Sequence, residues 1–369
     1  MDVFTKPIRF LLFLSLLTVA LYYGREVIIP FCFAALLSML FLPFNRRLER
    51  NGVNRGLASL ISVLIFVIAV AGLIALLVWQ MSDLSKDLSG IEQRISQYVD
   101  QARQYISKTF GVSEEQQKKM MEKQQSSGGG QLSGVVTGIM SSMFSIMVNF
   151  ILVLVYTFLL LYFRTHIRKF VLKLVRPEDQ AKSRSAMDKG SLVAQKYLSG
   201  LAMMIACLWI LYGIGFSIVG VKHAIFFAIL CGVLEIVPFV GNITGTALTI
   251  LATVAQGGQM NVVIGILIVY GLVQFFQTYI LEPLVVGAEV NINPLSTILV
   301  IVIGETLWGV AGMVLAIPLL GITKIICDHV EPLQPYGFLI GQEKKKDDSK
   351  IKDKLLDLFG RKNKNAKGK

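Results

Sequence analysis

The sequence has 369 residues, of which 54% are hydrophobic, and its mean hydropathy is +0.63. A soluble domain of this length needs far less apolar sequence, so the composition excludes an ordinary soluble protein and predicts an all-α polytopic membrane protein. The formal net charge of +12 is concentrated in residues 46–55, 164–196 and 342–369. The four cysteines have no CxxC spacing, and we therefore expect neither disulfides nor a zinc site, and no cofactor.

Apolar runs predict six full spans, because about 20 helical residues cross the hydrocarbon core. These runs are residues 8–24, 27–44, 57–80, 144–163, 198–220 and 261–281. The first two follow each other with no small-residue cleavage site between them, so we expect a retained hairpin rather than a signal peptide. By the positive-inside rule, the basic segments and both termini are cytoplasmic, and the net-neutral 81–143 region is outside. Attraction to anionic lipid explains the basic tail better than nucleic-acid binding does, and we expect no nucleic-acid partner.

This pattern divides the chain into five regions. They are spans one to three (1–80), an extracytoplasmic amphipathic helical region (81–143), spans four and five with the basic cytoplasmic loop 164–196 (144–220), a membrane region of broken helices (221–330) and a basic cytoplasmic tail (331–369). In the second region apolar residues recur at steps of four and three, beginning with Leu84, Leu88, Ile91 and Ile95. This heptad seam predicts either a helix that folds back on its own chain or one that packs against neighbouring subunits in a homo-oligomer.

The apolar runs of residues 221–330 are interrupted. Residues 224–234 and 243–255 form about 17 and 20 Å of helix, against a hydrocarbon core of about 30 Å. They predict a re-entrant hairpin with Pro238 and Gly241 near its tip. Residues 295–326, divided by Gly304 to Gly309 and by Pro318, predict a second hairpin. The expected fold therefore has about six spans and two re-entrant hairpins, or about eight membrane segments.

The interrupted helices carry the candidate transport path. Irregular backbone occurs at membrane depth only where it is buried in protein or lines a wet cavity, and a charge there costs about 2.5–3.5 kcal/mol. Glu235 lies beside Pro238, which frees backbone partners, and we expect it to be a coupling or gating carboxylate; the alternative for each glutamate is a structural role. Asn242 and Gln277 would contact a sugar-like or diol solute, or pack structurally. The candidate residues are Glu235, Pro238, Gly241, Asn242, Gln277, Glu282, Pro283, Gly287, Pro294 and Glu305.

The motifs limit the function classes. The sequence lacks GxSxG, HExxH, P-loop and GxGxxG patterns, and its three histidines are isolated, so we expect no enzyme. A secondary transporter needs a polar path and a titratable carboxylate, and the sequence contains both in outline. A non-transporting scaffold or regulator would account for the heptad seam and the tail, but it would not need glutamates in broken helices.

Five motifs, in this order, resemble the AI-2E transporter family, bacterial inner-membrane proteins also called PerM-like permeases. They are EIVPFVGN (235–242), QxxxxEPxxxG (277–287), NPL (293–295), GETLWGVxG (304–312) and LAIP (315–318), and the similarity covers most of the chain. The resemblance implies about eight membrane segments, oligomers and export of the signalling furanone autoinducer-2. Other members resemble sodium(lithium)/proton antiporters. We therefore expect an inner-membrane exporter of a small polar solute, with monovalent cation/proton antiport as the alternative.

Overall fold

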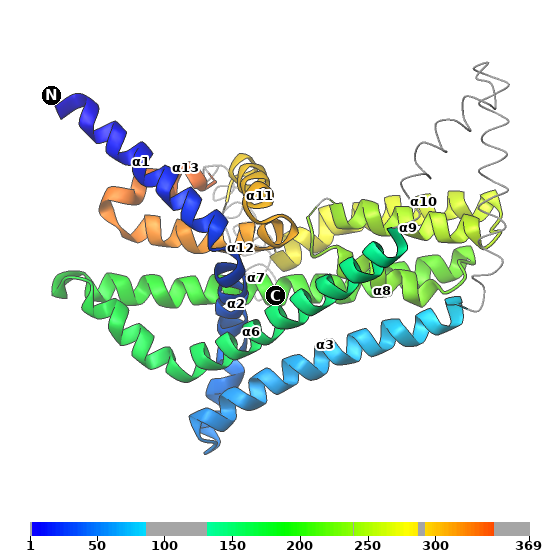
Figure 1. Cartoon of the computed structure of the whole chain (residues 1–369), viewed down its shortest axis with the longest axis horizontal. Coiled ribbons are helices and arrows are strands. Elements are labelled where there is room, and N and C mark those ends of the chain that lie inside the picture. Colours follow the sequence, from blue (N-terminus) through cyan, green and yellow to red (C-terminus); the bar gives the residue numbers. More distant parts are fainter. Residues whose placement is uncertain (1, 86–130, 239, 287–291, 343–369) are drawn as a thin grey trace, which may run out of the picture.

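The computed structural model describes residues 2–85, 131–238, 240–286 and 292–342 (Figure 1). The described residues are almost entirely helical, and their only β pairing is an isolated bridge between Ile292 and Gly341. The helices are α1 (Asp2–Tyr23), α2 (Arg25–Arg50), α3 (Arg55–Ser85), α6 (Gln131–Lys173), α7 (Gln180–Val219), α8 (Ala224–Leu234), α9 (Val240–Ala255), α10 (Met260–Phe276), α11 (Pro294–Trp308), α12 (Val310–His329) and α13 (Gln334–Ile340), with short 3-10 turns η1 (Pro177–Asp179) and η3 (Glu331–Leu333) and a π-helix η2 (Gln277–Val286).

The prediction of an all-α polytopic membrane protein is confirmed. Six helices of the described chain are long and apolar enough to cross a membrane, namely α2, α3, α6, α7, the α10–η2 segment and α12. The apolar part of α1, Leu11–Tyr23, is among the shorter helices, whereas α12 was expected to be one arm of a hairpin. Six spans were expected and six helices qualify, but α12 is among them in place of α1. Re-entry of the α8–α9 and α11–α12 pairs stays a prediction.

The central helix of the structure is α7. One face of it carries small and apolar residues at steps of three and four, which packs it against α8, α10, α12 and α2. Met204, Leu208, Tyr212 and Phe216 on this face join α8 and α10 residues in the largest apolar cluster. α7 ends at Gly220, whose φ of +83° is the left-handed conformation that glycine adopts without strain.

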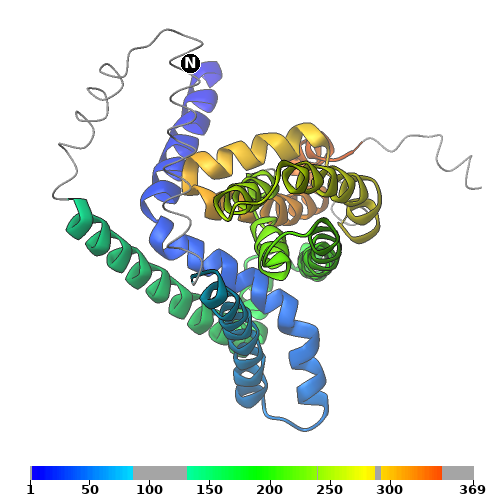
Figure 2. The same ribbon diagram turned by 90° about the vertical axis from the view of Figure 1, so that its right-hand side faces the viewer.

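The helices form two groups. Figure 2 shows α7 to α12 gathered into one bundle, with α1, α2, α3 and α6 on one side of it. The indole N–H of Trp308 on α11 donates to the Leu21 carbonyl of α1 at 2.9 Å and so connects the groups. The expected basic loop 164–196 is divided between the end of α6 and the start of α7. Most of the expected 81–143 region and of the expected tail, namely residues 86–130 and 343–369, lies outside the described chain.

Candidate functional site

The break between α8 and α9 contains Glu235 and Pro238. α8 ends at Leu234, and Glu235 is its C-cap. The Val237 N–H donates to the Leu234 carbonyl at 2.9 Å, and the Val240 N–H donates to the Pro238 carbonyl at 2.7 Å. Because Pro238 has no N–H and its ring obstructs a continuous helix, the chain turns here and begins α9. The expected tip of the first hairpin is thus an interruption of the helix.

Two glycines allow α8 and α9 to pack closely after this turn. Gly241 is buried, and a Cβ added there would overlap the Leu234 carbonyl. Gly245 lies one turn later, and a Cβ there would come within 2.9 Å of the Cys231 sulfur. Backbones approach this closely only where the side chain is absent. The position of Gly241 in the predicted site is therefore explained by packing of the backbone.

Glu235 is joined to Gln277 across the bundle. The Gln277 Nε2 donates to Glu235 Oε1 at 2.5 Å, although the residues are 42 positions apart. Gln277 is only 2% exposed. The second oxygen of Glu235 and the amide oxygen of Gln277 are both buried, and neither has a hydrogen-bond partner within the described residues. Glu282 lies close enough to interact electrostatically with Glu235 and Gln277. The fold thus brings together three residues that the sequence nominated for the transport path, namely Glu235, Gln277 and Glu282.

Asn242 belongs to a neighbouring hydrogen-bonded chain. The Tyr212 hydroxyl donates to Asn242 Oδ1 at 2.6 Å, and Asn242 Nδ2 donates to Gln274 Oε1. Gln274 Nε2 in turn donates to the Thr278 hydroxyl at 3.2 Å. This chain connects α7, α9 and α10 inside the apolar bundle. A buried amide whose partners come from two other helices fixes their relative positions.

A π-helix follows α10, and it was not expected. The segment η2 begins at Gln277 and contains Glu282 and Pro283. A proline inside an α-helix lacks an N–H and clashes with the carbonyl four residues earlier, and the wider π turn accommodates it. Such π segments occur frequently at functional sites. The expected Gly287 lies outside the described residues.

The remaining candidates lie in a different part of the bundle. Pro294 is the first residue of α11, and the preceding Asn293 caps that helix by accepting from the Ser296 N–H at 2.7 Å. Glu305 is exposed on α11, and within the described chain its carboxylate makes no hydrogen bond or ion pair. No hydrogen bond or ion pair among the described residues connects Glu305 with Glu235. Of the expected oligomer seam, Leu84 lies in the last turn of α3, and Leu88, Ile91 and Ile95 lie outside the described residues.

Two members of the polar group were missed by the sequence reasoning. Tyr212 lies in an apolar run and is 0% exposed, yet its hydroxyl binds Asn242. Gln274 lies three residues before Gln277 on α10 and so projects from a neighbouring position on the helix. Two amides three residues apart in an apolar helix could have identified Gln274 as a further member of the polar group. Tyr212 gave none, because its partner lies 30 residues away on another helix.

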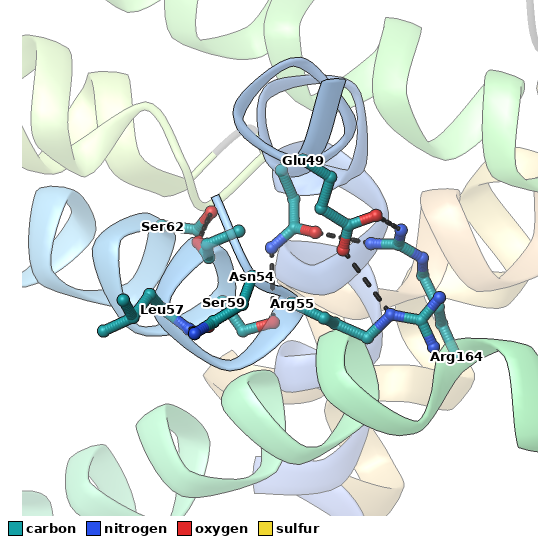
Figure 3. Close-up of polar contacts among 9 residues, drawn as sticks. Glu49, Asn54, Arg55, Leu57, Ser59, Ser62 and Arg164 are labelled. Carbon is teal, nitrogen blue, oxygen red and sulfur yellow. Dashed lines mark hydrogen bonds and ion pairs between the residues drawn. The ribbon is translucent and has the colours of Figure 1, made fainter. Parts of the chain in front are cut away.

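A second polar cluster joins the end of α2 and the start of α3 to α6 (Figure 3). Arg164 of α6 donates to both Glu49 and Asn45 of α2. Asn45 is 0% exposed, and its amide donates to the Ser59 hydroxyl of α3 at 3.2 Å. Arg55 lies 3.5 Å from Glu49 as a further ion pair. From the sequence, these charges indicated only the orientation of the chain, whereas in the structure they hold three helices together.

Comparison with known proteins bears on the whole chain. The model of the AI-2E family transporter matches residues 11–331. The chain is 23% identical over 354 residues to the "Putative transport protein YrrI" of Bacillus subtilis, covering 88% of this chain and 97% of that protein. A protein of Borreliella burgdorferi described in the same terms is 28% identical over 215 residues, which cover 57% of this chain and 59% of its own. The AI-2 transport protein TqsA of Escherichia coli is 25% identical, with 86% and 90% of the two chains covered.

Proposed function

Because the chain belongs to the AI-2E family of transporters, we propose that this membrane transport protein is a secondary transporter that exports a small polar solute. An autoinducer-2-like signal molecule is the first candidate, since one relative that matches most of this chain is an AI-2 transport protein. Support within the molecule comes from the buried polar groups of α7 to α10, which lie among helices that are otherwise apolar.

The observation that carries the proposal is the incomplete bonding of Glu235. This carboxylate lies at a helix break in the apolar bundle, where an ionisable group is expensive. One of its oxygens accepts from Gln277, while the other is buried without a partner among the described residues. A purely structural glutamate is stabilised by complete bonding. An unpartnered oxygen is suited to a proton, an ion or a solute that arrives and leaves, and Glu235 is accordingly the proposed coupling or gating carboxylate.

Monovalent cation/proton antiport is the second candidate function. The unpartnered oxygens of Glu235 and Gln277, with Glu282 close by, form a group of oxygen ligands. Carboxylate and carbonyl oxygens are the ligands that hard cations prefer. A cation site here would serve either antiport or solute export coupled to an ion gradient, so the two candidates differ in what is carried rather than in the role of Glu235.

Location and assembly are further parts of the proposal. The net charges of the loops support an inner membrane protein with both termini and residues 164–196 in the cytoplasm, and residues 81–143 outside. A cysteine at position 120 should then react with an impermeant reagent in cells that lack an outer barrier. Reaction only from the cytoplasmic side would reverse the orientation. We further propose a homo-oligomer that contacts through Leu84, Leu88, Ile91 and Ile95, with no nucleic acid involved.

The test compares Glu235→Gln with native protein in proteoliposomes. Gln keeps the shape of the side chain and removes the titratable group, so we expect normal expression and loss of most autoinducer-2 flux or of its pH dependence. Sodium flux is measured in the same vesicles to separate the two candidates. Glu178→Gln is the matched control, because the Glu178 side chain is 74% exposed in a turn. Native flux and pH dependence in Glu235→Gln would make Glu235 structural. Absence of any flux in native protein would favour a scaffold or regulator.

A further inference from the structure

The buried face of α9 carries polar side chains along almost its whole length. Asn242, Thr246, Thr249 and Thr253 recur at steps of four and three, which places them on one side of α9, and Gln256 continues the spacing in the turn that follows. We name them the α9 polar row. Their exposed fractions are between 0% and 9%. The row extends over about 21 Å of helix at 1.5 Å per residue, a large part of a hydrocarbon core about 30 Å thick.

The members of the row differ in how their hydrogen bonds are made. The hydroxyls of Thr249 and Thr253 donate to carbonyls of their own helix, each at 2.8 Å, as threonines in membrane helices commonly do. The Thr246 hydroxyl and both amide atoms of Gln256 are buried without any partner in the described part of the chain. Buried polar groups are almost always bonded, so these two residues need an explanation.

The row connects the outer end of the molecule with the site described above. Gln256 lies in the turn between α9 and α10, which Figure 1 places at the same end as the last turn of α3. In the proposed orientation that end is extracytoplasmic. Asn242 at the other end binds Tyr212 and Gln274, close to the Glu235 break. α8 packs against α9 between these points: the Cys231 sulfur lies 3.8 Å from the Thr249 hydroxyl of the row, and Gly245 packs directly on Cys231.

We propose that the α9 polar row is the wall that the transported solute contacts, and that Thr246 and Gln256 are its hydrogen-bonding positions. This inference rests on the proposed transport function and names the substrate class. Residues 240–260 contain no charged side chain. Hydroxyl and amide groups both donate and accept, and they replace the hydration of an uncharged solute with several hydroxyls. The row offers a cation or an organic anion no charged partner, so its chemistry favours a neutral solute. For solute to reach the row, α8 has to separate from α9, which it contacts at Cys231.

The test uses Thr246→Val, which keeps the shape and removes the hydroxyl, and Gln256→Leu. Thr244→Val is the matched control, because Thr244 is exposed on the same helix and its hydroxyl binds the Val240 carbonyl. With autoinducer-2 as the probe, each test variant should lower flux at subsaturating concentration about five- to tenfold, the effect of one lost hydrogen bond. Sodium flux measured without autoinducer-2 should stay unchanged. Thr246→Ser, which retains a hydroxyl, should transport like native protein.

The outcomes separate this inference from the proposed function. If Thr246→Val and Gln256→Leu transport autoinducer-2 at the native rate while Glu235→Gln impairs flux, the wall is elsewhere and the transporter proposal stands. Equal loss of flux in Thr244→Val, or in Thr246→Ser, would assign the effect to disturbed packing and overturn the inference. If native protein carries sodium but not autoinducer-2, a neutral-solute wall is likewise wrong. If native protein carries neither, both proposals fail.

Discussion

The two groups of helices in this protein bury their surfaces differently. In the apolar 18-residue stretch of α3, only 6% of the residues are buried within the chain, and in that of α6 the share is 11%. The corresponding share is 22% in α7 and in the α10–η2 segment and 33% in α12, while α2 of the first group is intermediate at 17%. α3 and α6 thus leave most of their apolar surface to lipid or to another subunit, whereas α7 to α12 pack on one another.

The polar side chains of the two groups differ in the same way. In the first group they lie where α2 ends and α3 begins, against Arg164 of α6, which bonds to Glu49 and Asn45. Glu49 Oε1 has no hydrogen bond but lies 3.5 Å from the Arg55 Nε in an ion pair. In the second group they lie inside the bundle at broken helices, and several atoms of Glu235, Gln277 and Gln256 lack partners among the described residues. Ion-paired groups between helices hold them together, while incompletely paired groups inside a bundle are available to a passing ligand. Substitutions should therefore affect stability in one group and flux in the other.

The largest effect is expected from Gly312→Leu, which tests the close packing of the second group. Gly304 and Gly312 approach so closely that a Cβ on either would overlap the other's backbone. We expect separation of α11 from α12 and a loss of stability of about 3 kcal/mol or more, from overpacking that cannot relax. Thermal unfolding in detergent measures it. Gly271→Leu is the control, since nothing lies within 4 Å of a Cβ there. Equal melting of both variants would refute the tight crossing.

A smaller loss of stability is expected in the first group from Arg164→Met. It leaves Asn45 and Glu49 with unmet bonds, and because the Arg164 and Glu49 side chains are 19% and 23% exposed, we expect about 1–3 kcal/mol. Arg168→Met, four residues further on, breaks an exposed pair with Asp188 and should cost less than about 1 kcal/mol. Flux per folded molecule should be native in both. A loss of flux in Arg164→Met at normal stability would remove the distinction between the groups.

The converse is expected of Tyr212→Phe in the second group. The change removes the hydroxyl that donates to Asn242 and should lower stability by about 1 kcal/mol. Flux should fall severalfold, because Asn242 would no longer be held at the end of the α9 polar row. Tyr279→Phe is the control, since Tyr279 is 69% exposed. Melting temperature and proteoliposome flux of each variant are compared, and unchanged flux in Tyr212→Phe would show that this position of Asn242 is unimportant.

The smallest effect concerns one hydrogen bond between the groups, which also pack together where Leu36 of α2 meets Ala194 of α7 and Leu315 of α12. Trp308→Phe deletes the 2.9 Å hydrogen bond to the Leu21 carbonyl and should lower the free energy of unfolding by about 0.5–1.5 kcal/mol. If the groups unfold separately, only one of two thermal transitions should move. A larger loss in the free energy of unfolding than in Arg164→Met would mean that the contacts between the groups are stronger than those within the first group.

Sequence predicted the elements better than their contacts. Length and hydropathy are local properties, so the spans at α2, α3, α7 and α10 followed from them, and the break at Pro238 followed from its missing N–H. The Glu235–Gln277 bond joins two motifs 42 residues apart, and no local pattern pairs them. The α9 polar row was visible at helical spacing, but threonines in an apolar run resemble ordinary packing until their partners are known.

The length of α7 gives the site a mechanical property. It is one uninterrupted helix of 40 residues, which reaches from the ion pairs of its first turns to Tyr212 and beyond. Asp188 and Tyr212 are 24 residues apart, so the rod between them measures about 36 Å, and a tilt of about 5° pivoting at Asp188 displaces Tyr212 by about 3 Å. That displacement exceeds the 2.6 Å between the Tyr212 hydroxyl and Asn242. Any tilt of α7 about its first turns would therefore be magnified at Tyr212, where the hydrogen bond to Asn242 is made.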